Sequence, residues 1–193
     1  MATARNDTTT KASTKSVASR KAAATTAPRT GAKDATALLR ADHKRVSALF
    51  EQYESTRSTA KKKTLVDTIC RELTIHAQVE EEIFYPAVKA ALKDKELIPE
   101  ATIEHATLKE LIAQVEGKEP DGEMFDARIK VMSEYVKHHV KEEQNEMFPK
   151  ARATRLDMNA LGEQIAARKE ELSAQPRTGK PTLLKQMVEM VTG

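Results

Sequence analysis

From Asp34 onward, apolar residues recur at the three- and four-residue spacing that is typical of amphipathic helices. Asp34 and either Ser58 or Thr59 fit the N-cap positions of helices. Pro99 fits a first helical turn, and Gly117 fits a helix end. The predicted helices cover about 34–55, 58–86 (or on to 92), 99–117, 121–149 and 157–174, with a short last one from Thr182.

The connections between the first four predicted helices are short, so neighbouring helices must run antiparallel. We therefore expect an all-α fold, an antiparallel up-down four-helix bundle with additional C-terminal helices and a disordered basic N-terminal tail. The expected division is a tail at 1–33, a four-helix domain at 34–150 and a C-terminal helical extension at 151–193.

Residues 1–33 consist almost entirely of Ala, Thr, Ser, Lys and Arg, without an apolar period. Seven basic residues against one acid give this segment a charge of +6, while the whole chain has a net charge of +3. Three interpretations stay open. The segment is a solvated extension without a specific role, a contact for nucleic acid through its phosphates, or a cleaved transit peptide.

The single cysteine, Cys70, excludes an internal disulfide and favours a reducing compartment. Its apolar surroundings predict a small buried core residue. No apolar run approaches the roughly 20 residues that span a membrane. The first residues also lack the apolar segment of a secretory signal. We expect a cytoplasmic protein without a membrane partner.

A duplicated motif occurs in the second and fourth predicted helices. The run from His76 to Glu80 returns as the run from His139 to Glu143, and both lead, at the same offset, to an aromatic residue and a proline. Residues four apart share a helix face. Each motif therefore presents one imidazole and one carboxylate to the same side.

A second pair of histidines repeats in the first and third predicted helices. His43 and His105 each follow an acidic residue and precede matching apolar positions. His43 lies 33 positions before His76, and His105 lies 34 before His139. With a rise of about 1.5 Å per residue, the four rings are expected at one level of the bundle, to within about a turn.

Four imidazoles and two carboxylates at one level match the donors that transition metals prefer inside helix bundles. The predicted metal site consists of His43, His76, Glu80, His105, His139 and Glu143. Glu80 and Glu143 would bridge two irons, and each iron would take about two nitrogens. Two alternatives to an iron site are a purely structural bundle without metal and a zinc site. Zinc is disfavoured because the carboxylates are spaced to bridge and no cysteine ligand is offered.

Other polar residues of the same helices are weaker candidates. We expect His138 to be exposed or to lie behind the ligands, and Glu81 and Glu142 to be solvated. Glu72 and Tyr135 lie one turn before the two motif histidines. They are expected near the site, where they would pack or hydrogen-bond to the ligands.

These residues resemble the hemerythrin-like family, specifically its HHE cation-binding domains, over about residues 35–150. The motifs that carry the resemblance are Asp-His43-Lys, His76 to Pro86, Glu-His105 and His139 to Pro149. The resemblance implies a non-haem di-iron centre with an oxo or hydroxo bridge, held by the six residues named above. It further implies a protein that binds or reacts with O2, peroxide or NO, and we expect a role in stress response.

The chain departs from the oxygen-carrying hemerythrins at two places. Lys109 stands where their third helix supplies a second histidine, and Glu143 follows His139 at four residues rather than an aspartate at five. One imidazole fewer leaves an additional coordination position. This favours peroxide or NO chemistry, or iron exchange, over simple O2 transport. Whether the protein turns over, as a catalase-like enzyme would, stays open.

An alternative function is also consistent with the sequence. The four-helix domain would sense or store iron, and the basic tail or the last predicted helix would attach it to nucleic acid or to a protein partner. This interpretation depends on the charge of residues 1–33 and on the apolar residues that follow Thr182.

Overall fold

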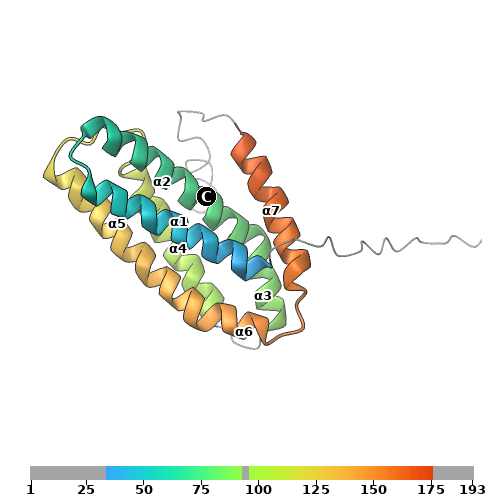
Figure 1. The fold of residues 1–193 in the computed structure, drawn as a ribbon. Coiled ribbons are helices and arrows are strands. Elements are labelled where there is room, and N and C mark those ends of the chain that lie inside the picture. The colour runs from blue at the N-terminus through green and yellow to red at the C-terminus, as the bar shows by residue number, and fades with distance from the viewer. Residues whose placement is uncertain (1–33, 93–95, 176–193) are drawn as a thin grey trace, which may run out of the picture.

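The computed structural model describes residues 34–92 and 96–175. Four long helices pack side by side in the antiparallel arrangement expected from the sequence (Figure 1). They are α1 (Ala35–Ser55), α2 (Thr59–Val79), α4 (Leu97–Ala113) and α5 (Glu123–Glu142). The predicted all-α bundle is confirmed, and the described ranges contain no strand. The predicted tail and the predicted helix from Thr182 lie outside the described residues.

Two of the long helices continue beyond their α-helical part. A π-helical turn and a short α-helix follow α2 as η1 (Glu80–Phe84) and α3 (Tyr85–Ala91). The same pair follows α5 as η2 (Glu143–Met147) and α6 (Phe148–Arg152). The fourth helical segment therefore runs past its predicted end near Pro149. A proline, which lacks a backbone N–H, is the second residue of each short helix and closely follows the π turn.

The helix starts follow from local side chains. The Asp34 carboxylate accepts a hydrogen bond from the backbone N–H of Ala37, as expected of an N-cap. Ser58 caps α2 in the same way. Gly122 begins α5 with a φ of 113°, a backbone angle that favours glycine. Asp157 caps α7 (Met158–Ala174), the predicted fifth helix, which packs against α1 and α2 (Figure 1).

Two apolar cores fill the bundle and leave a polar layer between them. The core at the α3, α6 and α7 end includes Leu39, Val79, Phe84, Phe148 and Ile165. The core at the other end includes Val46, Phe50, Leu73, Ile112, Phe125 and Met132. Cys70 is buried in the second core, as predicted. Among the described helices, none has the length and apolar character needed to cross a membrane.

Candidate metal centre

The polar layer between the two cores gathers most of the buried polar side chains of the described ranges. Its members are Asp42, His43, His76, Glu80, His105, His139 and Glu143. All six predicted ligands belong to it, and each is at most 6 % exposed. Burying so many titratable groups is costly unless they are paired or bind a metal. The layer is therefore the part of the bundle that needs a functional explanation.

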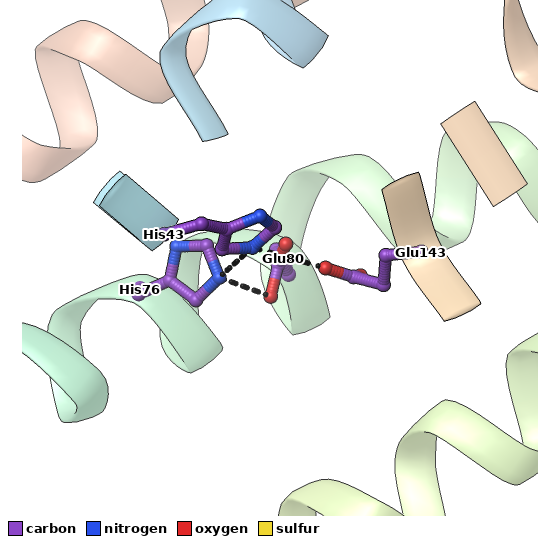
Figure 2. A group of neighbouring side chains, drawn as sticks. All are labelled: His43, His76, Glu80 and Glu143. Atoms are coloured by element: carbon purple, nitrogen blue, oxygen red, sulfur yellow. Dashed lines mark hydrogen bonds and ion pairs between the residues drawn. The ribbon is translucent and has the colours of Figure 1, made fainter. Parts of the chain in front are cut away.

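One half of the layer is formed by α1 and α2 with the two carboxylates. The Nε2 atoms of His43 and His76 lie 2.9 Å apart. A Glu80 oxygen lies 3.2 Å from Nε2 of His76, and a Glu143 oxygen lies 3.2 Å from Nε2 of His43. Figure 2 shows these four side chains converging from α1, from α2 with η1, and from η2. Four donor atoms thus face one small volume.

The other half is formed by α4 and α5. The Nε2 atoms of His105 and His139 lie 3.2 Å apart. Glu80 Oε2 lies 3.4 Å from Nε2 of His105, and Glu143 Oε2 lies 3.7 Å from Nε2 of His139. Both glutamates therefore lie between the two histidine pairs. This is the placement that a bridging carboxylate requires.

The carboxylates themselves indicate that a cation belongs here. Both oxygens of Glu80 and Oε2 of Glu143 are fully buried and have no hydrogen-bond partner in the described structure. Oε2 of each glutamate lies 3.2 Å from an imidazole nitrogen but accepts no hydrogen bond, which is unfavourable for a buried carboxylate. Metal ions would satisfy these oxygens and the converging Nε2 atoms together. The donor set thus fits a pair of transition-metal ions with nitrogen and oxygen ligands.

The far nitrogen of each ring is also held. Nδ1 of His76 lies 3.4 Å from Asp42, and Nδ1 of His139 lies 2.6 Å from Glu104. These contacts fix the ring orientation and leave Nε2 as the nitrogen that faces the centre. Carboxylates behind metal-binding histidines commonly have this role.

The remaining two rings are held differently from each other. Nδ1 of His105 lies 3.0 Å from Glu81, whose carboxylate also pairs with Lys109 at 2.7 Å. Nδ1 of His43 lies 2.9 Å from the side-chain amide of Gln144. The prediction that Glu81 is solvated was wrong. Glu81 is half-buried because the ring from α4 reaches across to it.

The two π turns begin at the two glutamates. Their backbone hydrogen bonds join Tyr85 N–H to Glu80 C=O and Phe148 N–H to Glu143 C=O. The residue five positions after each glutamate is therefore turned towards the layer. The Tyr85 hydroxyl donates to Glu143 Oε1 at 2.9 Å and lies 3.1 Å from Nε2 of His105. Sequence reasoning missed this hydroxyl.

Phe148 is the counterpart of Tyr85 in the repeat. Its ring lies parallel to that of His43, with centroids 5.8 Å apart. The Tyr85 ring is tilted over His105 at 5.2 Å. Each lone histidine is thus covered by an aromatic ring, but only one ring brings a hydroxyl. The aromatic residue that follows each motif at the same offset was the signal that could have identified Tyr85.

Four other predicted neighbours lie away from the centre. His138 is exposed, as expected, and forms a surface group with Glu142 at 3.1 Å and Glu104 at 3.8 Å. Glu72 pairs with Arg45 at 2.8 Å, and Tyr135 packs against the second core. The packing role expected of Tyr135 is therefore seen, whereas Glu72 pairs with Arg45 rather than with a ligand.

Burial and neighbouring charge affect the two glutamates in opposite ways. Burial, with the adjacent Glu143 charge, raises the pKa of Glu80 well above its ordinary value. Burial also acts to raise the pKa of Glu143, but the imidazoles of His43 and His139 outweigh it, and this pKa is lowered. Burial lowers the pKa of His76 to about 4. A neutral ring is the form that binds a metal.

Comparison with known proteins agrees with this geometry. The chain matches the Hemerythrin HHE cation binding domain family over residues 34–151. Its structure resembles the crystal structure of an HHE domain-containing protein from Mycobacterium kansasii, a homolog of Rv2633c, with a TM-score of 0.62. The two are 23% identical, and the match covers 72% of this chain and 87% of that one. This likeness shows a shared fold.

Two relatives are similar to this chain in sequence. The uncharacterized protein Rv2633c of Mycobacterium tuberculosis is 28% identical over 140 residues, which are 68% of this chain and 85% of that protein. A DNA nickase of Nostoc is 28% identical over 111 residues, which are 58% of this chain. The match covers only 31% of the nickase's length. The resemblance predicted from the histidine and glutamate motifs is confirmed, and the chain belongs to the hemerythrin HHE cation-binding domain family.

Proposed function

We propose that the polar layer holds two non-haem irons and that the protein reacts there with a small oxidant, either peroxide, O2 or NO, in a stress response. The observation that carries the proposal is the meeting of four Nε2 atoms with three buried carboxylate oxygens that have no hydrogen-bond partner. Family membership in a cation-binding domain supports the same conclusion.

The geometry suggests how the six residues would be shared. His43 and His76 would hold one iron, and His105 and His139 the other. Glu80 and Glu143 would contact both, since each lies near rings of both pairs. Bound iron would supply Lewis acidity and redox capacity to a small ligand.

The surrounding residues determine how a ligand is treated. The apolar cores on both sides exclude bulk water, which strengthens every electrostatic interaction in the layer. The Tyr85 hydroxyl is a proton donor held within the layer by Glu143 at 2.9 Å. Reduction of peroxide consumes protons, so a held O–H beside the centre suits peroxide chemistry. The carboxylates behind the rings keep each Nε2 aimed inward.

The test is the metal content and visible spectrum of protein purified from iron-replete cells, recorded before and after addition of hydrogen peroxide. About two irons per chain are expected, together with an iron absorption band that is altered by peroxide. Release of O2 during this reaction would identify a peroxide-decomposing enzyme. Substoichiometric iron and a featureless spectrum would contradict the proposal.

The second candidate is an iron-sensing or iron-storing module that attaches to nucleic acid or a protein partner. Two observations favour it: residues 1–33 carry a charge of +6, and one relative, of which the match covers a part, is a DNA nickase. Deleting residues 1–33 should abolish binding to duplex DNA at low salt and leave the iron spectrum unchanged. Equal DNA binding with and without this segment would exclude the tail as the contact.

A further inference from the structure

A pocket opens between α1 and α5 directly beside one predicted ligand. Its volume is about 290 Å³, and its lining includes His43, Ser47, Lys137, Lys141, Gln144 and Asn145. His43 is the only one of the six predicted ligands among its lining residues. The pocket is large enough for a small ligand together with several waters. It therefore connects the surface with the edge of the layer.

The repeat explains why the bundle is open here. Ser47 follows His43 at four residues, and Lys109 follows His105 at four residues. The Lys109 side chain reaches the carboxylate that contacts this histidine and binds both oxygens of Glu81 at 2.7 Å. Ser47 is far shorter, so the corresponding volume beside His43 is left to the pocket.

The charges at the two places also differ. Lys137 and Lys141 are exposed at the pocket, and no carboxylate lines it among the described residues. Their counterparts in the repeat are the uncharged Thr74 and Gln78. Gln144 likewise replaces a carboxylate, because Glu81 is its counterpart. Two lysines without a lining acid give the pocket a positive potential, and such a potential concentrates anions.

We propose that this pocket is the entrance through which small inorganic anions reach the metal centre beside His43. Ser47 provides the opening, and Lys137 and Lys141 draw the anion in. The inference rests on the proposed iron centre and adds to it a route and a further class of ligand, small anions, beside the uncharged oxidants O2, NO and hydrogen peroxide. Beside His105 the corresponding place is occupied by the Lys109–Glu81 pair.

Azide is a suitable probe because it is a small anion whose binding to ferric iron can be followed by absorbance. The experiment measures the azide association rate by stopped flow with the iron-loaded, oxidised full chain. Ser47→Lys, which copies the other half, should slow association at least tenfold. Lys137→Gln with Lys141→Gln should slow it roughly three- to tenfold at low salt and flatten its salt dependence.

The matched control removes two exposed lysines on other helices, Lys61→Gln with Lys89→Gln, and should leave the rate unchanged. Circular dichroism and iron content verify that each variant is folded and loaded. If Ser47→Lys does not fold, the variant with Lys137→Gln and Lys141→Gln alone tests whether the pocket is the entrance. If azide binds with the same association rate in every variant, the pocket is not the entrance, although the iron centre is still supported. A protein that binds no iron would instead contradict the proposed function.

Discussion

The half of the layer around His43 and the half around His105 have the same ligands but different surroundings. Both present paired imidazoles, with Nε2 atoms 2.9 Å apart in one and 3.2 Å apart in the other. Behind His105 stand the Glu81 carboxylate and Lys109, and above it lies the Tyr85 hydroxyl. His43 has an amide, a serine and a phenylalanine in the corresponding places.

This difference separates two functions of the layer. The repeated residues are those that would bind metal, so metal binding should depend equally on both halves. The residues that are not repeated differ in charge, size and proton-donating ability. Access and reactivity should therefore depend on one half more than on the other.

Removal of a ligand should have the same consequence in either half. His76→Ala and His139→Ala each remove one nitrogen, and each should reduce the iron content from about two per chain to one or fewer. Metal analysis and the visible spectrum measure this. His138→Ala is the neighbouring control, and it should keep its iron because this ring is exposed. Loss of iron in only one of the two ligand variants would refute the equivalence of the halves.

Removal of the single hydroxyl should affect reactivity rather than metal binding. Tyr85→Phe makes the two halves alike and should lower the rate of peroxide decomposition roughly 100-fold, the contribution of a positioned proton donor. Its iron content should stay unchanged. The reciprocal change, Phe148→Tyr, tests whether a hydroxyl over His43 can substitute for the lost one in the double variant. An unchanged rate in Tyr85→Phe would show that the proton comes from elsewhere.

The two glutamates should respond oppositely in the metal-free protein. Glu80→Gln removes a carboxyl group whose ionised form is disfavoured by burial and by the neighbouring Glu143, and it should raise the free energy of unfolding by roughly 1–3 kcal/mol. Glu143→Gln removes a carboxylate stabilised by histidines and should lower that free energy by a similar amount. Chemical denaturation monitored by circular dichroism measures both. The same sign for both variants would contradict the assignment.

The pH dependence of these two variants follows from the directions of the pKa shifts. The folded-state pKa of Glu80 is raised, so its destabilising effect is absent below the ordinary value of 4.5 and grows as the pH rises above it. The gain from Glu80→Gln should grow in the same way. The pKa of Glu143 is lowered, so its contribution is present at neutral pH and is lost on acidification. The loss from Glu143→Gln should disappear at acidic pH.

Changing the side chain that contacts Nδ1 of His105 or His43 should have the smallest effect, a modest change in iron affinity. Glu81→Gln gives His105 the same amide that His43 already has, and it should weaken iron binding roughly tenfold, at the low end for such partners. Gln144→Glu is the reciprocal change and should strengthen binding. Competition with a chelator of known affinity measures both. Equal affinities in the two variants would show that the partner's charge has no influence.

Local sequence rules predicted the bundle and the inward-facing donors. The Asp34 and Ser58 caps depend on contacts within a few residues, and so they can be recognised without knowledge of the fold. The i, i+4 spacing placed each motif histidine on the same face as its glutamate. The structure brings these donors together, and their role as iron ligands remains a prediction.

The residues that sequence reasoning missed depend on features that the 3.6-residue period does not contain. In a regular α-helix, a residue five positions after Glu80 lies roughly 140° away from it. The π turn from Glu80 to Phe84 reduces this rotation and carries Tyr85 into the layer. Glu81 was assigned to solvent because its partner, His105, comes from another helix. Glu72 was expected at the site, but Arg45 of the neighbouring helix holds it outside.

An anomalous difference map of crystals of the iron-loaded protein would locate the irons themselves. Two iron peaks are expected inside the layer, one beside His43 and His76 and one beside His105 and His139, with both glutamates in contact with them. A single peak would contradict the proposed pair of irons. Iron found only at the surface group of Glu104, His138 and Glu142 would contradict the site itself.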